Sequence, residues 1–226
     1  MTYRNILKAK FIKRINRFVA VCEVNGKEEY CHVKNTGRCS EILIEGADCY
    51  LEVATNPTRK YRYSLVSVKK GNRLINIDSQ APNKAVAEFL ESGKLFNDIQ
   101  NLRSEKVFGN SRFDFYFEYN GIKAYLEVKG VTLEREGAVF FPDAPTERGT
   151  KHLKELCRCT EAGYEAYVLF VVQMKSVMYF SPNTETDPAF SLALQNAAAN
   201  GVQILCYDCN VTESGMNIAD RIPVIV

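Results

Sequence analysis

A predicted β-hairpin between residues 111 and 131 carries the residue types best suited to metal-dependent chemistry. Asn120-Gly121 separates two runs rich in aromatic and apolar residues, and this dipeptide is a strong signal for a two-residue hairpin turn. With these residues in the loop, Asp114 is expected to lie directly opposite Glu127. Opposed like charges destabilise a sheet, and a bound divalent cation would remove the repulsion. Mg²⁺, or Mn²⁺, is the expected ion, because Mg²⁺ commonly binds one or two carboxylates together with phosphate oxygens.

The same register assigns the side chains of the hairpin to its two faces. Because side chains alternate along a strand, one face is predicted to carry Arg112, Asp114, Tyr116, Glu127 and Lys129. The other face is predicted to contribute Phe113, Phe115, Phe117, Leu126 and Val128 to a core, although a bulge would change the register. Lys129 would stabilise developing negative charge or position an attacking water. In the alternative interpretation, Arg112 and Lys129 only neutralise a surface charge cluster.

A second candidate segment, Phe141–His152, precedes and opens a predicted helix over 146–162 with Thr146 as its N-cap. Arg148, Lys151 and His152 lie in the first turns, where the helix dipole disfavours positive charge. An external anion approaching this end would explain them. A solvated charged face is the alternative.

The front half adds two basic segments. His32–Arg38 places polar and basic groups, including Arg38, around a predicted turn. Pro57–Tyr63 interleaves Arg59, Lys60 and Arg62 with tyrosines, as a nucleic-acid groove with stacking platforms would. Ordinary surface loops would also have this composition.

The charge distribution favours a polyanionic partner. The 226 residues have a formal net charge of only +2, but residues 1–80 hold 15 Lys and Arg against 8 Asp and Glu, a net +7. Residues 81–226 hold 14 against 19, a net −5. Such asymmetry indicates a nucleic-acid partner despite the near-neutral total. With 46% hydrophobic and 25% charged residues, the composition excludes a disordered tail or a small disulfide scaffold.

The elements that must position these residues divide at Ala81-Pro82-Asn83. Residues 1–80 show five predicted short strands, which favour a small barrel of the oligonucleotide-binding type, with a generic β-domain as the alternative. The five predicted strands span residues 18–24, 27–33, 48–54, 61–68 and 74–77. Asn83 is the predicted N-cap of a helix over 84–90, and later strands (113–119, 122–131, 166–172, 202–207) alternate with helices (146–162, 188–200). This alternation predicts an α/β sheet flanked by helices in an α+β chain overall.

Membrane and export signals are lacking from the sequence pattern. The first twenty residues hold six basic residues but no apolar signal-peptide core, and the longest apolar run, 166–172, is too short to span a bilayer. Reduced cysteines in a cytoplasm are therefore expected. A zinc site formed by Cys157, Cys159, Cys206 and Cys209 is a less favoured alternative to buried structural thiols.

Together these segments resemble the sugar fermentation stimulation protein (SfsA) family over nearly the whole chain. The most specific pieces are His32–Arg38, Ser111–Phe115, Glu127–Gly130 and Phe141–His152. The resemblance implies an OB-fold-like domain over 1–80, a PD-(D/E)XK nuclease-like domain over 81–226, DNA binding and a link to sugar-utilisation genes in bacteria. Carried over by position, it makes Asp114 and Glu127 the two acids of the nuclease motif and Lys129 its lysine. Glu88 is the candidate for a further acid from an early helix, with Glu105 as a rival.

These observations lead to a hypothesis and two alternatives. The leading hypothesis is a Mg²⁺-dependent nuclease, a phosphodiesterase that hydrolyses DNA or RNA. The first alternative is a non-catalytic DNA-binding regulator of sugar-utilisation genes, and the second is a regulator that responds to a sugar. We infer no membrane or protein partner; a homodimer is compatible with the sequence.

Overall fold

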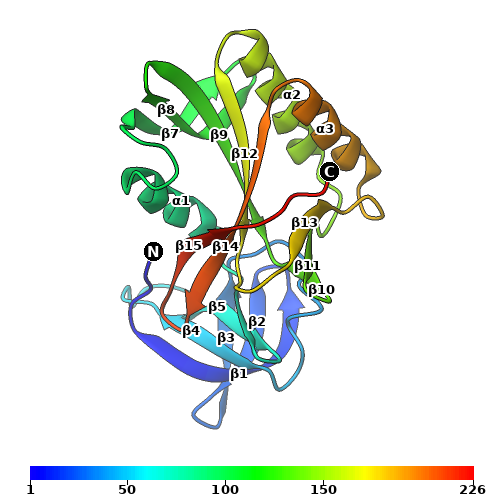
Figure 1. The fold of residues 1–226 in the computed structure, drawn as a ribbon. Helices are drawn as coiled ribbons and strands as arrows, with labels where there is room; N and C mark the ends of the chain where they lie inside the picture. Colours follow the sequence, from blue (N-terminus) through cyan, green and yellow to red (C-terminus); the bar gives the residue numbers. More distant parts are fainter.

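The structure, a computed structural model, describes residues 1–226 and contains a barrel followed by a sheet with helices on both faces (Figure 1). The barrel consists of β1 (Ile6–Asn16), β2 (Val19–Val24), β3 (Lys27–Val33), β4 (Asp48–Val53), β5 (Tyr63–Lys70) and β6 (Arg73–Asn76). Its strand order is β3-β2-β1-β4-β5-β6. An additional parallel pairing of β3 with β5 closes five of these strands into a barrel. The predicted barrel is therefore confirmed.

Strand β1 was not predicted, although it lies at the centre of the barrel sheet between β2 and β4. It carries four exposed or half-exposed basic side chains and two irregularities in its pairing with β2. These interrupt the alternation of apolar and polar residues by which a strand is recognised.

The second part of the chain forms a six-stranded sheet with the order β15-β14-β12-β9-β8-β7. Its strands are β7 (Gln100–Phe108), β8 (Ser111–Tyr119), β9 (Ile122–Val131), β12 (Glu165–Val172), β14 (Gln203–Thr212) and β15 (Gly215–Arg221). A small sheet of β10 (Leu133–Arg135), β11 (Ala138–Phe141) and β13 (Tyr179–Pro182) lies beside it. Strand β12 runs parallel to both β9 and β14, as the predicted strand–helix alternation requires.

Helices cover both faces of the large sheet. Helices α2 (Glu147–Glu161) and α3 (Pro188–Ala199) share a hydrophobic cluster with Val168, Phe170 and Val172 of β12, whereas α1 (Ala81–Glu91) shares another with Leu169 and Val171. Alternate residues of one strand point to opposite faces, so α1 lies across the sheet from α2 and α3 (Figure 1). None of the three helices is long and apolar enough to cross a membrane.

Two predicted helix starts have different outcomes. Thr146 is the N-cap of α2, as predicted, because its hydroxyl accepts a hydrogen bond from the Gly149 N–H at 3.0 Å. Asn83 is not an N-cap, and that prediction was wrong. Helix α1 already begins at Ala81, with Pro82 in its first turn, where the missing N–H of proline costs no helical hydrogen bond. Asn83 therefore lies inside the helix and its side chain is free for another role.

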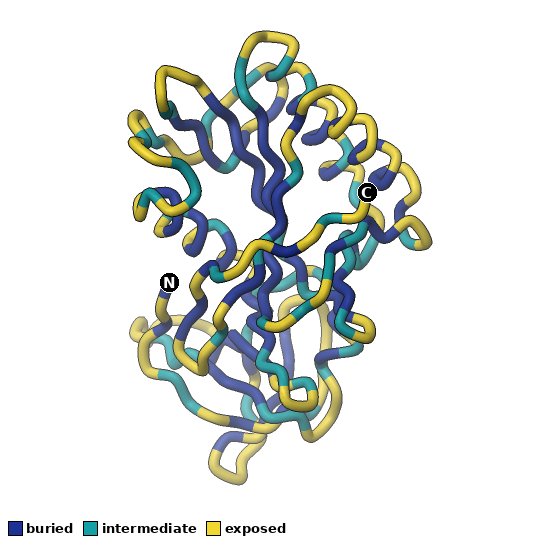
Figure 2. Tube along the Cα trace, viewed as in Figure 1, coloured by how far each residue is buried: buried dark blue, intermediate teal, exposed yellow.

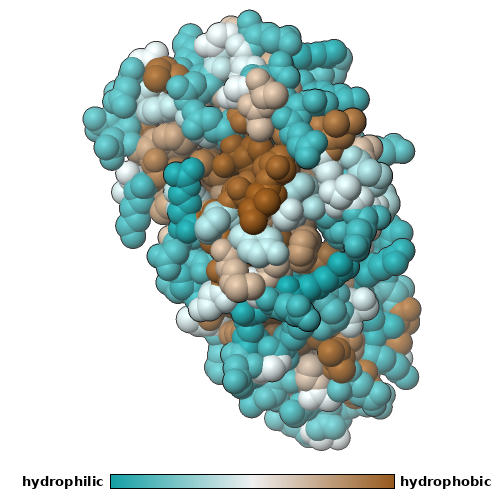
Figure 3. Space-filling model, turned by 45° about the vertical axis from the view of Figure 1, so that its right-hand side comes forward, coloured by the Kyte–Doolittle hydropathy of each residue, from teal (hydrophilic) through white to brown (hydrophobic).

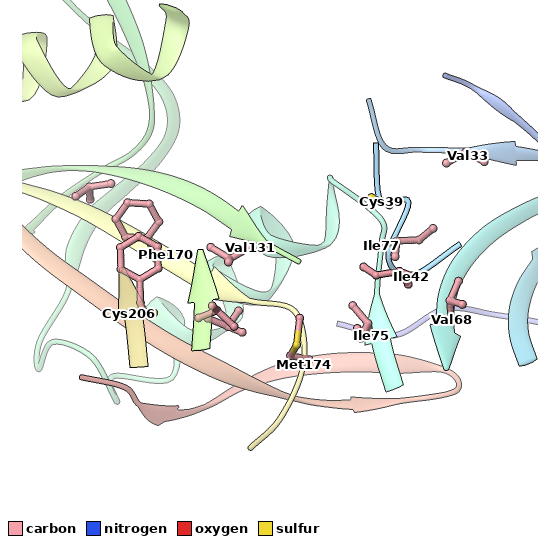
Figure 4. Packing of buried hydrophobic residues seen from close by; sticks show 14 of the residues in the cluster. Val33, Cys39, Ile42, Val68, Ile75, Ile77, Val131, Phe170, Met174 and Cys206 are labelled. Atoms are coloured by element: carbon pink, nitrogen blue, oxygen red, sulfur yellow. The ribbon is translucent and has the colours of Figure 1, made fainter. Parts of the chain in front are cut away.

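The barrel and the second part are joined by a continuous core. One cluster of 37 buried residues contains both Ile75 and Ile77 of the barrel and Phe170 and Cys206 of the large sheet. Figure 4 shows Met174 between these two groups. Figure 2 shows that the strands at the junction of the barrel and the large sheet are buried. This packing holds the barrel and the large sheet in a fixed arrangement.

The surface is predominantly hydrophilic. Figure 3 shows one larger hydrophobic area on this side of the molecule, and the exposed apolar side chains include Leu192 of α3 and Ile225 and Val226 at the end of the chain.

Candidate active site

The predicted hairpin register holds near the turn and ends before the acids. Pairing runs from Tyr119↔Ile122 to Phe115↔Leu126, as the Asn-Gly turn requires, and stops there. Asp114 does not pair with Glu127: its Oδ2 accepts a hydrogen bond from the Val128 backbone N–H at 2.7 Å. The side chain thus replaces a backbone acceptor, and the regular ladder is interrupted.

This irregularity also changes the faces of the strand. Phe113 belongs to the same cluster as Tyr116, on the α2 side of the sheet, while Phe115, Phe117 and Leu126 belong to the α1 side. Residues three apart cannot share a face of a regular strand. The predicted face of Phe113, the pairing of Arg112 with Lys129 and the directly opposed acids were therefore wrong, because the pairing of β8 with β9 ends at Phe115 and Leu126.

Asp114 lies between the sheet and the start of α1. Its Oδ1 accepts a hydrogen bond from the Asn83 side-chain amide at 2.7 Å. Burial, followed by repulsion from the Glu127 carboxylate, raises the pKa of Asp114 to about 6, against the opposing effects of the Val128 N–H and Asn83. The two acids therefore interact electrostatically, as predicted, although they are not a directly opposed pair.

Glu127 is the more deeply buried acid, 4% exposed, and it lies toward α2. Its Oε1 accepts a hydrogen bond from Lys129 Nζ at 2.7 Å and contacts His152 Nδ1. Burial alone would raise the pKa of Glu127, but the His152 hydrogen bond and Lys129 outweigh it and lower this pKa. The site thus holds one carboxyl whose pKa is raised beside one whose pKa is lowered, a pattern that frequently accompanies catalytic sites.

His152 is a partner of Glu127 and is only 5% exposed. We predicted it as a nucleic-acid contact, but its buried position makes it a positioning group for the acid. Arg148 Nε approaches His152 Nε2 at 3.4 Å, and because a guanidinium can only donate, Nε2 must accept. Nδ1 then carries the proton and donates to Glu127.

The donor set fits a hard divalent cation. Glu127 Oε2 is buried and has no hydrogen-bond partner, which leaves an acceptor that a cation would satisfy. No group of three or more His, Cys, Asp or Glu side chains is placed to hold a metal ion. Mg²⁺ needs only one or two carboxylates, because water and substrate phosphate oxygens complete its coordination. Asp114 and Glu127 are the residues that would hold it.

Two hollows that include residues of the Phe141–His152 segment are lined by basic side chains. The first, of about 560 Å³, is lined by seven residues that include four of the predicted nucleic-acid contacts: Asn110, Ser111, Arg112, Glu147, Arg148, Lys151 and His152. The second, of about 490 Å³, is lined by Arg14, Asn16, Arg17, Thr36, Gly37, Arg38 and Ala144. The two hollows lie at the two ends of the Phe141–His152 segment.

The second hollow is where the barrel meets that segment. Asp143 Oδ2 accepts a hydrogen bond from the Arg38 N–H at 3.2 Å. A Cβ on Gly37 would lie 2.3 Å from the same oxygen, so only glycine allows this close approach. The two sequence segments are therefore in direct contact.

Comparison with known proteins agrees with this architecture. Residues 12–77 match the family model described as SfsA N-terminal OB domain, and residues 80–215 match the one described as Sugar fermentation stimulation protein RE domain. The chain belongs to the SfsA family. A "Sugar fermentation stimulation protein homolog" from Desulfitobacterium hafniense (strain Y51) is 54% identical over 224 residues, covering 99% of this chain and 98% of the relative. The homolog from Clostridium beijerinckii is 53% identical over the full length of both chains.

A solved SfsA structure has the same fold. It is described as the structure of Pyrococcus furiosus SfsA in complex with Ca²⁺, and it matches with a TM-score of 0.91 at 26% identity, covering 100% of this chain and 98% of the other. The OB assignment of the barrel in this SfsA chain is thereby confirmed.

Neither candidate for a further acidic ligand in this SfsA chain contacts Asp114 or Glu127. Glu88 Oε2 pairs with the amino terminus of Met1 at 2.5 Å, and Glu88 forms no hydrogen bond with Asp114 or Glu127. The α1 residue that reaches Asp114 is Asn83. The rival, Glu105, pairs with Arg112 at 2.6 Å on the edge of the sheet. The structure thus provides neither as a third ligand.

In this SfsA chain the basic residues of the barrel loop make their contacts within the barrel. Arg59, Lys60 and Arg62 are exposed, and Arg59 Nη2 lies 3.1 Å from His32 Nδ1. Lys60 and Arg62 each lie over the ring of the following tyrosine.

All eight cysteines are free thiols, and burial raises the pKa of Cys159 to about 12.

Two residues of the SfsA site were not predicted. Gln173 follows β12 and is 2% exposed; its amide donates to Asn76 and to the Asp78 carbonyl. A Cβ on Gly130 would lie 2.5 Å from Gln173 Oε1, so Gly130 permits the approach. A polar residue directly after a buried parallel strand was the available signal, because ligands bind at the carboxyl ends of such strands. Arg14 was also missed: its guanidinium donates to the carbonyls of Asn16, Arg17, Asn35, Gly37 and Arg38.

Proposed function

We propose that this SfsA chain is a Mg²⁺-dependent nuclease that hydrolyses phosphodiester bonds of DNA or RNA in the cytoplasm, with a PD-(D/E)XK-like second domain. The observation that carries the proposal is the pair formed by half-buried Asp114 and buried Glu127 beside Lys129, with an unpartnered Glu127 Oε2. An unsatisfied acceptor beside a second acid is costly in a protein that binds no cation. A cation bound at the active site would be the missing partner of Glu127 Oε2.

The residues of the chain have separable roles in this mechanism. A bound Mg²⁺ would act as a Lewis acid on a phosphoryl oxygen and lower the pKa of a water. Asn83 and the Val128 N–H orient Asp114, and His152 orients Glu127. Lys129, whose Nζ lies 2.7 Å from Glu127 Oε1, supplies positive charge where negative charge develops on the phosphate.

Two further observations support a metal and a nucleic acid. The Pyrococcus furiosus relative is described in complex with Ca²⁺, which, like Mg²⁺, is a hard cation that binds oxygen ligands. The two basic hollows that include residues of the Phe141–His152 segment contain Arg38, Arg148 and Lys151, which suit a phosphate backbone. The excess positive charge of residues 1–80 lies on an OB barrel, a fold that often binds oligonucleotides.

The test is cleavage of labelled single- and double-stranded DNA and RNA by purified protein, with Mg²⁺, with Mn²⁺ and in EDTA. Asp114→Asn and Glu127→Gln should each abolish cleavage. Glu88→Gln is the matched control, since Glu88 is an acid that touches neither site acid, and it should retain cleavage. Cleavage in EDTA, or cleavage by Asp114→Asn equal to that of the unaltered protein, would refute the mechanism.

A non-catalytic DNA-binding regulator is the second candidate. It is favoured by the absence of a third carboxylate or histidine placed to hold a metal. Under this proposal the protein binds DNA with the same affinity whether or not Asp114 is replaced, and no metal supports cleavage of any of the four substrates.

A further inference from the structure

The hollow at the start of α2 contains a buried hydroxyl without a partner. Ser111, the first residue of β8, lines this hollow and is 6% exposed, and its Oγ forms no hydrogen bond. A buried hydroxyl without a partner destabilises a folded protein, because it has lost its hydrogen bonds to water. Rotation of the Ser111 side chain toward the hollow that it lines would let Oγ donate to a ligand oxygen there.

The charge of the hollow specifies what kind of ligand that is. Arg112, Arg148 and Lys151 contribute three positive charges, and Glu147 is the one carboxylate among the lining residues. No lining residue is hydrophobic, so the hollow does not suit an apolar ligand. Arginine, lysine and serine together are the side chains that commonly bind nucleic-acid phosphates.

The three basic side chains of the hollow form few hydrogen bonds and ion pairs within the protein. Lys151 Nζ donates to the Asn110 carbonyl at 2.9 Å, and the single contact of Arg148 is the long one to His152. Arg112 pairs with Glu105, but both of these side chains are more than half exposed, so this pair contributes little. Donors on all three residues therefore remain for a phosphate.

His152 connects this hollow to the acids. It lines the hollow, and its Nδ1 contacts Glu127. A ligand in the hollow is therefore one residue away from the candidate metal ligands. The volume of about 560 Å³ is sufficient for a nucleotide and its phosphate.

We propose that this hollow is a subsite that holds a phosphate of the nucleic-acid strand next to the phosphodiester being cut, with Ser111, Arg148 and Lys151 as its donors. This inference rests on the proposed function for its location, but the binding it describes does not require cleavage. The phosphate is either a terminal monoester or an internal diester of the strand, and both present the same oxygens to these donors.

The experiment measures fluorescence polarisation of labelled single-stranded 12-mer DNA in EDTA, where metal-dependent cleavage cannot occur. Three linear probes carry a 5′-phosphate, a 3′-phosphate or hydroxyls at both ends. A circular oligonucleotide competes with them for the protein. The variants are Ser111→Ala and Lys151→Gln. The controls are Ser67→Ala, which removes another buried hydroxyl without a partner from the barrel, and Lys27→Gln, which removes an exposed lysine from a barrel hairpin.

Ser111→Ala should weaken binding about 10-fold or more, the effect of losing one hydrogen bond to a charged group, without lowering the melting temperature. Lys151→Gln should weaken binding to a similar extent and reduce the slope of log affinity against log salt by about 0.7. Losses confined to one end-phosphorylated probe identify a terminal phosphate, and equal losses for all probes, the circular competitor included, identify an internal phosphate. Both outcomes support the subsite.

Wild-type affinity of both variants for every probe would overturn the subsite, as would a wild-type protein that binds none of the probes. These results are distinct from failure of the nuclease proposal. A protein that shows the Ser111 and Lys151 effects but cleaves nothing retains the subsite and loses the nuclease activity. A protein that cleaves with Mg²⁺ while both variants bind normally retains the activity and loses the subsite.

Discussion

Replacing Asp114 by Asn should stabilise the metal-free protein. The pKa of Asp114 is raised from 3.8 to about 6, because burial and the Glu127 carboxylate disfavour its charge. A raised carboxyl pKa means that ionisation opposes folding, so stability from this group is present below pH 3.8 and is lost as the pH rises through about 6. At pH 8 the penalty is about 3 kcal/mol, from roughly two pKa units at 1.36 kcal/mol each.

Asparagine removes this penalty and can keep the local hydrogen bonds. Its side-chain oxygen can accept from the Val128 N–H, and the Asn83 amide can turn so that its oxygen accepts from the new amide. The Asp114→Asn protein should therefore melt about 5 to 10 °C higher than the unaltered protein in EDTA at pH 8. At pH 5 the difference should fall to about half, because Asp114 is then largely protonated in the folded protein.

The assay is calorimetric unfolding in EDTA at pH 5 and pH 8, repeated with excess Mg²⁺. Mg²⁺ should stabilise the unaltered protein, by about 2.7 kcal/mol at 100 times the dissociation constant, and should not stabilise Asp114→Asn. Metal binding and cleavage should both rise with pH through about 6, because only the ionised Asp114 is a ligand.

Glu127→Gln is the control of opposite sign. The pKa of Glu127 is lowered by His152 and Lys129, so its charge stabilises the fold, and removal should destabilise the protein by about 3 kcal/mol or more. If Asp114→Asn melts at or below the temperature of the unaltered protein at pH 8, or is stabilised equally by Mg²⁺, this electrostatic description of the site is refuted.

Three further predictions concern the surroundings of the acids. His152→Ala removes the group that orients the buried acid and should raise the Mg²⁺ concentration required for half-maximal thermal stabilisation about 10-fold or more; an unchanged Mg²⁺ titration would contradict this role. Gly130→Ala brings a Cβ to within 2.5 Å of Gln173 Oε1 and should cost about 1–3 kcal/mol in denaturant unfolding, whereas wild-type stability would show that the strand can shift. Arg14→Lys keeps the charge but loses the guanidinium that donates to five carbonyls, so the midpoint of unfolding should fall, with Arg17→Lys as an exposed control that should leave it unchanged.

Local signals predicted much of the framework. The turn Asn120-Gly121 determined the pairing from Tyr119↔Ile122 to Phe115↔Leu126, because a two-residue hairpin leaves one register. Thr146 before an amphipathic run determined the start of α2. Buried strands such as β9 and β12 were predicted from their apolar runs, whereas the edge strand β7 was missed because most of its side chains are exposed.

The candidate site depends on contacts between residues far apart in the sequence. The chain's residue types identified Asp114, Glu127 and Lys129, but not the contacts of Asp114 with Asn83 and of Glu127 with His152. A hairpin rule covers only neighbouring strands. The pairing of β8 with β9 ends where the Asp114 side chain accepts the Val128 N–H, and the Asn83 and His152 contacts come from helices packed on the two faces.

The basic residues were also predicted in part from the sequence and placed in part by the tertiary structure. The sequence alone determined that the first 80 residues are basic and that Arg148 and Lys151 lie early in a helix. Only the tertiary structure decided that Ser111 and Arg112, from a strand some 40 residues earlier, line one hollow with them, and that His152 is buried against an acid. Composition and spacing describe residues that are close in sequence. A binding site brings together residues that are far apart in sequence, and tertiary packing decides the distances between them.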